Sequence, residues 1–249
     1  MSLTVRPAAP RERPAFYALA PGGWRDLITL LHPPYTAWHL SYVAIGAAVA
    51  PTIHGWRLAA AIGAFFLAVG VSAHALDERL SRPLGTGISD RTLVALAAIA
   101  LGGAVGIGIL GAVTVSLTIV PFIVVGTFMV IAYDLELWGG RFHSDLWFAT
   151  AWGAFPAFTG YWADALHLSA QGILVAVACA LLSAAQRSLS TPVRVLRRRT
   201  LALSGEQTLA DGATVSVDAR SIAAPMEGAL RAMAAAMVML AAALVAARA

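Results

Sequence analysis

The sequence is poor in charge and in cysteine and contains no lysine, and each shortage narrows the class of protein. Only 12% of the 249 residues are charged, against about 25% in soluble globular domains. Its single cysteine, Cys179, excludes an intramolecular disulfide framework. Hydrophobic residues make up 59% of the chain. This composition excludes an ordinary soluble enzyme and indicates a membrane protein.

The N-terminal region lacks a short apolar core followed by a small-residue cleavage site, so we expect no cleavable signal peptide. Residues 1–22 hold several arginines and prolines and predict a disordered or loosely docked tail. Residues 24–31 are amphipathic and predict a short helix at the membrane interface, which His32-Pro-Pro34 ends.

Long apolar runs predict an all-α fold, a polytopic transmembrane helical bundle of about seven spans. One helix over 93–133 would reach roughly 60 Å at 1.5 Å per residue, about twice the ~30 Å hydrocarbon core. That run therefore predicts two spans with a turn near 111–114. Its Gly102 and Gly106 form a Gly-x-x-x-Gly pair, which predicts close helix packing. The other expected spans are about 36–53, 58–76, 146–162, 169–185 and 229–247.

Arginine placement predicts the orientation, because cytoplasmic loops are enriched in positive charge. With the N-terminus inside and the C-terminus outside, the outer segments hold only Arg57 and Arg248. We therefore expect a multi-pass protein of the cell (cytoplasmic) membrane. The inner segments hold the tail arginines and Arg79, Arg82, Arg91, Arg141, Arg187, Arg194, Arg197, Arg198, Arg199 and Arg220.

Four segments organise the chain. We expect an N-terminal tail with an interfacial helix (1–34), a transmembrane core (35–187), a cytoplasmic basic loop (188–225) and a last transmembrane helix (226–249). In the basic loop, residues 200–203 and 214–218 alternate apolar and polar on either side of Asp211-Gly212, which predicts a small hairpin.

Two polar loops on the cytoplasmic side carry the candidate site. In the first, His74, Asp77 and Glu78 stand at i, i+3 and i+4 and share one helix face. The second, residues 133–145, follows the fourth span. Ionisable groups at membrane depth are costly and commonly mark a site. We therefore expect the two loops to meet.

A metal site is one hypothesis for these loops. Mixed histidine and carboxylate ligands favour Zn, Mn or Fe, and an all-oxygen set favours Mg²⁺. The alternative is that the acids pair with Arg79, Arg82 and Arg141 and only staple the loops together; Asp145 alone could be a helix N-cap. The candidate ligands are His74, Asp77, Glu78, Glu136, His143 and Asp145.

The block Arg82-Pro-Leu-Gly-Thr-Gly-Ile-Ser89, directly after the acidic cluster, resembles the first signature of the UbiA superfamily of intramembrane prenyltransferases. Residues 133–160, which include Gly153-Ala-Phe-Pro156, are similar to the segment after that family's fourth helix. The resemblance covers about 24–190. It implies a bundle with a cavity open to lipid, in which two Asp-rich motifs hold Mg²⁺ on a polyprenyl diphosphate. The place of the second Asp-rich motif, 185–194, contains no carboxylate.

Three functions remain open. The first is a prenyl-transferring or prenyl-processing enzyme that uses Mg²⁺, with Asp77 and Glu78 as catalytic carboxylates. The second is a diverged metalloenzyme with Zn, Mn or Fe that acts on a lipid or terpenoid. The third is a non-catalytic lipid-binding subunit. In each, the partners are lipids and not nucleic acid. The expected substrate-binding residues are Arg82, Tyr133, Arg141, Arg187 and Arg194.

Overall fold

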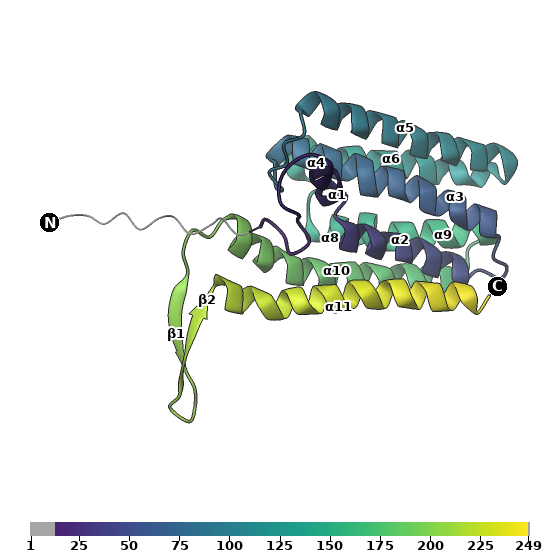
Figure 1. Ribbon diagram of the computed structural model, residues 1–249. Helices are drawn as coiled ribbons and strands as arrows, with labels where there is room; N and C mark the ends of the chain where they lie inside the picture. Colours follow the sequence, from purple (N-terminus) through teal and green to yellow (C-terminus); the bar gives the residue numbers. More distant parts are fainter. Residues whose placement is uncertain (1–12, 249) are drawn as a thin grey trace.

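The computed structural model describes residues 13–248, most of which lie in helices that run along one common direction (Figure 1). The predicted tail falls partly in residues 1–12, outside the described residues. The elements are α1 (Trp24–Leu30), α2 (Pro33–Ala48), α3 (Gly55–Phe65), η1 (Phe66–Ala73), α4 (His74–Ser81), α5 (Asp90–Thr114), η2 (Leu117–Ile119), α6 (Val120–Asp134), α7 (Leu137–Gly140), α8 (Asp145–Ala149), η3 (Thr150–Ala154), α9 (Phe155–Ala165), α10 (Ala170–Arg198), β1 (Ser204–Thr208), β2 (Thr214–Asp218) and α11 (Ala219–Ala246).

Five helices are long and apolar enough to cross a membrane, which supports the predicted multi-pass helical bundle. They are Gly55–Ser81, Asp90–Thr114, Leu117–Asp134, Ala170–Arg198 and Ala219–Ala246. Two of the seven expected spans are not among these five: 36–53 corresponds to α2, of 16 residues, and 146–162 to the rod formed by α8, η3 and α9. Both lie among the other helices (Figure 1).

The element boundaries differ from the sequence prediction in three places. Helix α10 continues to Arg198 and α11 begins at Ala219, so the non-helical part of the basic loop is only 199–218. The turn predicted at 111–114 lies at 115–116, because α5 continues to Thr114. The hairpin forms, but its first strand is Ser204–Thr208 and not 200–203.

Helix α2 lies at the centre of the bundle and packs on α9 and α11. Its contact with α9 is a close backbone approach that only glycine permits. A Cβ on Gly46 would lie 1.9 Å from the Ala157 carbonyl oxygen, and one on Gly160 would lie 2.1 Å from the Val43 carbonyl oxygen. Small residues that bring two helices together are a common packing device in membranes.

Gly102 and Gly106 do not pack on another helix within the described residues, in contrast to the prediction. Among these residues, nothing on a neighbouring element lies within 4 Å of a Cβ built on either glycine. Instead, a Cβ on Gly103 would lie 3.1 Å from the Leu67 side chain, and one on Gly108 would lie 2.8 Å from the Ile123 side chain. The contacting face of α5 is therefore rotated from the one that the sequence motif suggested.

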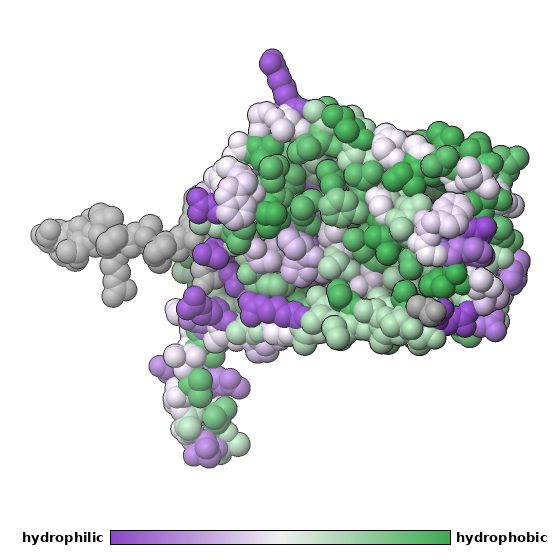
Figure 2. All heavy atoms as spheres, turned by 45° about the vertical axis from the view of Figure 1, so that its right-hand side comes forward, coloured by the Kyte–Doolittle hydropathy of each residue, from purple (hydrophilic) through white to green (hydrophobic). Residues whose placement is uncertain are grey.

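The two polar loops lie at one end of the bundle, which we call the polar end: residues 13–35, 74–90, 133–145 and 187–199. It is the end at which α4, α6 and α10 finish and from which the hairpin projects (Figure 1). Figure 2 shows mostly hydrophobic residues along the side of the bundle, with hydrophilic residues gathered towards its two ends. This distribution is the one a bilayer requires.

Candidate functional site

Glu78 folds the loop that follows α4. Its side chain is fully buried, and its carboxylate accepts hydrogen bonds from the backbone N–H of Leu84 (2.9 Å), the backbone N–H of Thr86 (2.8 Å) and the Thr86 hydroxyl (2.9 Å). Both carboxylate oxygens are thus engaged within the loop. The geometry gives Glu78 a structural role and lends no support to its predicted roles as catalyst or metal ligand.

Arg82 completes the same loop. It takes the left-handed backbone conformation at the end of α4 and donates to the carbonyl oxygens of Ile88 (2.6 Å) and Thr86 (3.4 Å). Its guanidinium also pairs with Asp90. From α1, the buried Asp26 accepts from Gly87 N–H at 3.0 Å. The loop is thus stapled as the alternative expected, but through other partners: Arg82 pairs with Asp90, and none of the described candidate acids forms an ion pair with Arg79, Arg82 or Arg141.

The second loop is built on an aromatic stack. The His143 ring lies 4.3 Å from the Tyr133 ring, and its Nδ1 lies 3.2 Å from the Tyr133 carbonyl oxygen. Glu136 is exposed and has its carboxylate 3.9 Å from His143 Nδ1. Arg141 is exposed at the same loop.

Arg187 ties this loop to α10. Its Nη1 donates to the Tyr133 hydroxyl at 2.9 Å, and its Nε donates to Asp145 at 2.8 Å. The guanidinium also lies 4.9 Å from the centre of the Phe148 ring. The N-cap of α8 is Ser144, whose hydroxyl accepts from Trp147 N–H, and not Asp145.

Asp77 and three charged groups of the polar end that interact with it electrostatically form what we call the charged cluster: Asp77, Asp134, Arg194 and Arg198. The charges of Arg198, His143 and Arg194 act on the Asp77 carboxyl, and Asp77 in turn acts on Asp134. Asp134 is buried, and its Oδ2 has no hydrogen-bond partner within the described residues. Among the described residues, Arg194 donates to the Thr191 hydroxyl at 3.1 Å and pairs with no carboxylate. The cluster thus leaves donors and acceptors free for a ligand.

Three histidines line the same end. The rings of His32 and His74 stack at 4.0 Å. His74 Nδ1 lies 3.1 Å from the Gly70 carbonyl oxygen, and His39 Nδ1 lies 2.7 Å from the Trp152 carbonyl oxygen. Both carbonyls belong to the π-helical segments η1 and η3, where the wider turn frees backbone oxygens. Each π segment therefore fixes one imidazole.

Over residues 13–248, no three His, Cys, Asp or Glu side chains lie close enough together to hold a metal ion. The predicted set is divided among different partners, with Glu78 in its loop, Asp145 on Arg187 and His74 on His32. Asp77 and Asp134 are the two neighbouring carboxyls whose oxygens are not claimed in this way. Two carboxylates plus substrate phosphates suit Mg²⁺ better than a transition metal.

Residues 13–23 form a strap across the polar end. Arg197 and Arg198 hold it by donating to the carbonyl oxygens of Arg13 (3.2 Å) and Pro14 (3.1 Å). The Tyr17 ring packs on His32 at 5.3 Å and on Tyr35 at 5.5 Å. Burial, reinforced by the neighbouring His74, holds the pKa of His32 well below its usual range. The strap therefore covers a neutral, aromatic surface.

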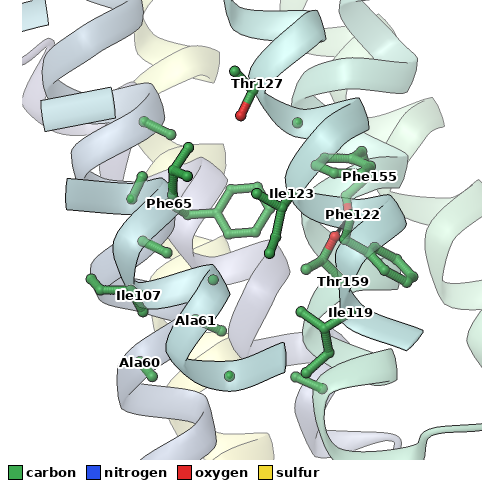
Figure 3. Close-up of a pocket in the computed structure, with 18 of the residues that line it drawn as sticks. Ala60, Ala61, Phe65, Ile107, Ile119, Phe122, Ile123, Thr127, Phe155 and Thr159 are labelled. Carbon is green, nitrogen blue, oxygen red and sulfur yellow. Dashed lines mark hydrogen bonds between the residues drawn. The ribbon is translucent and has the colours of Figure 1, made fainter. Parts of the chain in front are cut away.

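An apolar pocket of about 140 Å³ lies between α3, η1, α5, α6 and α9 (Figure 3). Phe65, Phe122, Ile123 and Phe155 project into this space from three different helices. Its wall includes Trp152, which packs against Tyr133 at 5.5 Å. The Trp152 side chain thus lies between the pocket and Tyr133 of the polar end.

No family model, curated protein or solved structure matches this chain. The site must therefore be interpreted from its geometry. Sequence reasoning missed the roles of Asp26, His32 and Asp134. Asp26 and Asp134 could have been found as acids beside apolar helices in a chain with few charges. The sequence carried no sign of the role of His32, because its stacking partner His74 is 42 positions away (74 − 32).

Proposed function

We propose that the protein is an intramembrane enzyme that transfers or processes a prenyl or polyprenyl (di)phosphate at the polar end. The observation that carries the proposal is the charged cluster, in which the charges of Arg194 and Arg198 act on Asp77 although no ion pair joins them to it within the described residues. Arg194 is half-buried, and burying a guanidinium without a carboxylate partner costs free energy unless a bound anion pairs with it. The resemblance of 82–89 to the UbiA signature points to the same substrate class.

In this proposal, α10 supplies the phosphate contacts. Arg187, Arg194 and Arg198 stand at i, i+7 and i+11, so they share one face of the helix. They would stabilise the charge that develops on the diphosphate as the allylic C–O bond breaks. Tyr133 holds Arg187 in place through its hydroxyl. Arg82 and Arg141 belong to the loops beside this face.

Asp77 and Asp134 are the residues that fit a Mg²⁺ carried by the diphosphate, because their oxygens are not used by the loops. When bound, Mg²⁺ would neutralise charge on the leaving group. The acceptor would supply the electron pair for the new bond to the allylic carbon. By the positive-inside rule, we place the polar end at the cytoplasmic face of the cell membrane.

The test is release of inorganic diphosphate from farnesyl and geranylgeranyl diphosphate by the purified protein with Mg²⁺. We expect turnover by the wild type and a loss of at least about a hundredfold in D77N, since transition-state charge stabilisation is typically worth that much. The matched control is E136Q, at an exposed acid of the neighbouring loop, which should keep wild-type activity. Equal activity in both variants would remove Asp77 from the site.

A non-catalytic lipid-binding role is the second candidate, and it is favoured by one observation: Glu78 and Arg82 of the signature block are used to fold their own loop. This function predicts saturable binding of a prenyl phosphate without release of diphosphate. Binding that R194Q weakens, together with no turnover on either substrate, would favour it over the enzyme.

A further inference from the structure

We propose that the apolar pocket is a second ligand site, which binds a single-chain carboxylate amphiphile with its headgroup at Arg57. This site lies away from the charged cluster and does not rest on the proposed function. Arg57 is in the first turn of α3, at the end of the bundle opposite the polar end. The inference follows from the shape of the pocket, the position of Arg57 at one end of it and the Arg57 Nε, a donor without a hydrogen-bond partner in the described part of the chain.

The pocket is long and narrow. Its lining runs along α3 and η1 from Trp56 to Val69, which is about 20 Å at 1.5 Å per residue. A volume of about 140 Å³ resembles that of cavities that hold a benzene-sized ligand. Spread over this length, it accommodates part of one extended chain and not a two-chain lipid. Phe65 and Ile123 narrow the middle of the pocket (Figure 3).

Arg57 is the only charged residue among the described residues that line the pocket. Its Nη1 donates to the Ala163 carbonyl oxygen at 3.3 Å, and its guanidinium lies 5.5 Å from the Trp56 ring centre. Its Nε is buried and has no hydrogen-bond partner within the described part of the chain. A buried donor without a partner costs about 1–3 kcal/mol, and an acceptor on a bound headgroup would remove that cost.

Asp164, at the same end, does not satisfy Arg57, although its own Oδ2 is buried without a hydrogen-bond partner among the described residues. Asp164 Oδ1 accepts from the His54 backbone N–H at 3.0 Å and lies 2.9 Å from His54 Nδ1. Within the described residues, no ion pair joins Asp164 to Arg57. At the same end, Arg248 Nη2 donates to the carbonyl oxygens of Ala50 (2.8 Å) and Pro51 (2.6 Å). Of these two arginines, Arg57 is thus the one that lines the pocket and keeps a buried donor without a partner among the described residues.

The charge balance selects a carboxylate. The guanidinium edge with a free Nε fits a planar carboxylate through two parallel hydrogen bonds. Arg57 is the single charge among the described residues that line the pocket, so one negative charge on the ligand balances it. A singly charged headgroup is therefore tolerated better than a doubly charged phosphate monoester.

The experiment measures quenching of tryptophan fluorescence by a fatty acid brominated at mid-chain, with the full-length protein in detergent micelles. Trp56 and Trp152 both line the pocket and report on its occupation. The comparison ligands are the methyl ester of the same acid and the matching brominated alkyl phosphate. We expect saturable quenching by the acid, with affinity about tenfold higher than that of the ester, as one charge-assisted hydrogen bond implies.

Two variants and one control complete the test. R57Q should lower the affinity for the acid about tenfold and remove the preference over the ester. A61F should abolish saturable quenching by filling the pocket, which Ala61 lines (Figure 3). R248Q, at the neighbouring arginine outside the pocket, should behave as the wild type.

Three results would overturn the proposal. They are equal binding of acid and ester by the wild type, tighter binding of the alkyl phosphate than of the acid, and unsaturable quenching of the kind that detergent-dissolved lipid gives. The wild-type comparison needs no variant, so the proposal can fail even if A61F does not fold. The quenching experiment does not depend on diphosphate release, so a negative result would leave the enzymatic proposal unaffected.

Discussion

The Glu78 carboxylate accepts hydrogen bonds from both the backbone N–H and the side-chain hydroxyl of Thr86, which stands eight residues later in the chain. This contact closes the loop after α4 around a buried charge. It also separates two neighbouring acids by role, because Asp77 remains directed to the charged cluster while Glu78 serves the fold. Adjacent acids on one helix thus face different environments.

Glu78 should be critical for stability. In E78Q, the amide NH₂ replaces an oxygen that accepts a loop N–H, so one buried donor loses its partner. We expect a loss of roughly 2–3 kcal/mol, the value of a hydrogen bond to a charged group. Thermal unfolding in detergent measures it. E136Q, at an exposed position, should stay within about 0.5 kcal/mol of the wild type; similar losses in both variants would contradict the role assigned to Glu78.

The crossing of α2 and α9 should not tolerate a side chain at Gly160. A Cβ there would lie 2.1 Å from the Val43 carbonyl oxygen, which forces the two backbones apart. G160A should therefore lose its monodisperse peak in size-exclusion chromatography or unfold at a much lower temperature. The control is G228A on α11, where nothing lies within 4 Å of the added Cβ. A wild-type profile for G160A would show that this crossing is looser than described.

Acid should loosen the strap through His32. Its pKa is held below that of the unfolded chain, so the unfolded state binds more protons as the pH falls below about 6.5, and stability falls with it by up to about 1.4 kcal/mol per pH unit. Above the unfolded pKa, this contribution is fully present. The groups facing His32 are His74, His39, Tyr17, Arg194 and Arg198.

Unfolding temperatures measured from pH 7.5 downwards check this prediction. The H32F variant keeps the aromatic packing and removes the titrating group, so its stability should depend less on pH than that of the wild type. Identical pH profiles would assign the acid sensitivity to another group.

Arg194 should contribute directly to phosphate binding. R194Q removes a guanidinium that has no described carboxylate partner, so we expect about tenfold weaker binding of inorganic diphosphate, measured by calorimetry. The matched control is R91Q, because Arg91 is an exposed arginine of the first turn of α5 that has no role in the proposed site. The unfolding temperature of R194Q should not fall, since no internal ion pair is lost. A marked fall would indicate a structural role instead.

The sequence predicted the positions of most helices because their signal is local. Apolar runs of membrane-spanning length exist whatever their neighbours are, and so do the turn at Asp211-Gly212 and the acids of the two loops. The alternation of helix direction follows from these runs and brings the two loops to one end. That part of the candidate site could be predicted from the amino-acid sequence.

The partners within the site could not be predicted in this way, because they depend on which face of each helix turns inward. Glu78 and Asp77 are adjacent in sequence and could not be assigned different roles, and Gly103 could not be preferred over Gly102 as a contact. Helix rotation is set by side-chain packing across the bundle, and the two π segments shift it further.

Composition and the spacing of apolar runs alone therefore determined that this is a helical membrane protein with most of its acids and arginines gathered at one end. The tertiary structure decided which of those charges fold their own loop, as with Glu78 and Arg82, and which form no ion pair among the described residues, as with Arg194. The physical reason is that a hydrogen bond depends on distance and direction in space, and sequence spacing fixes neither for residues on different helices.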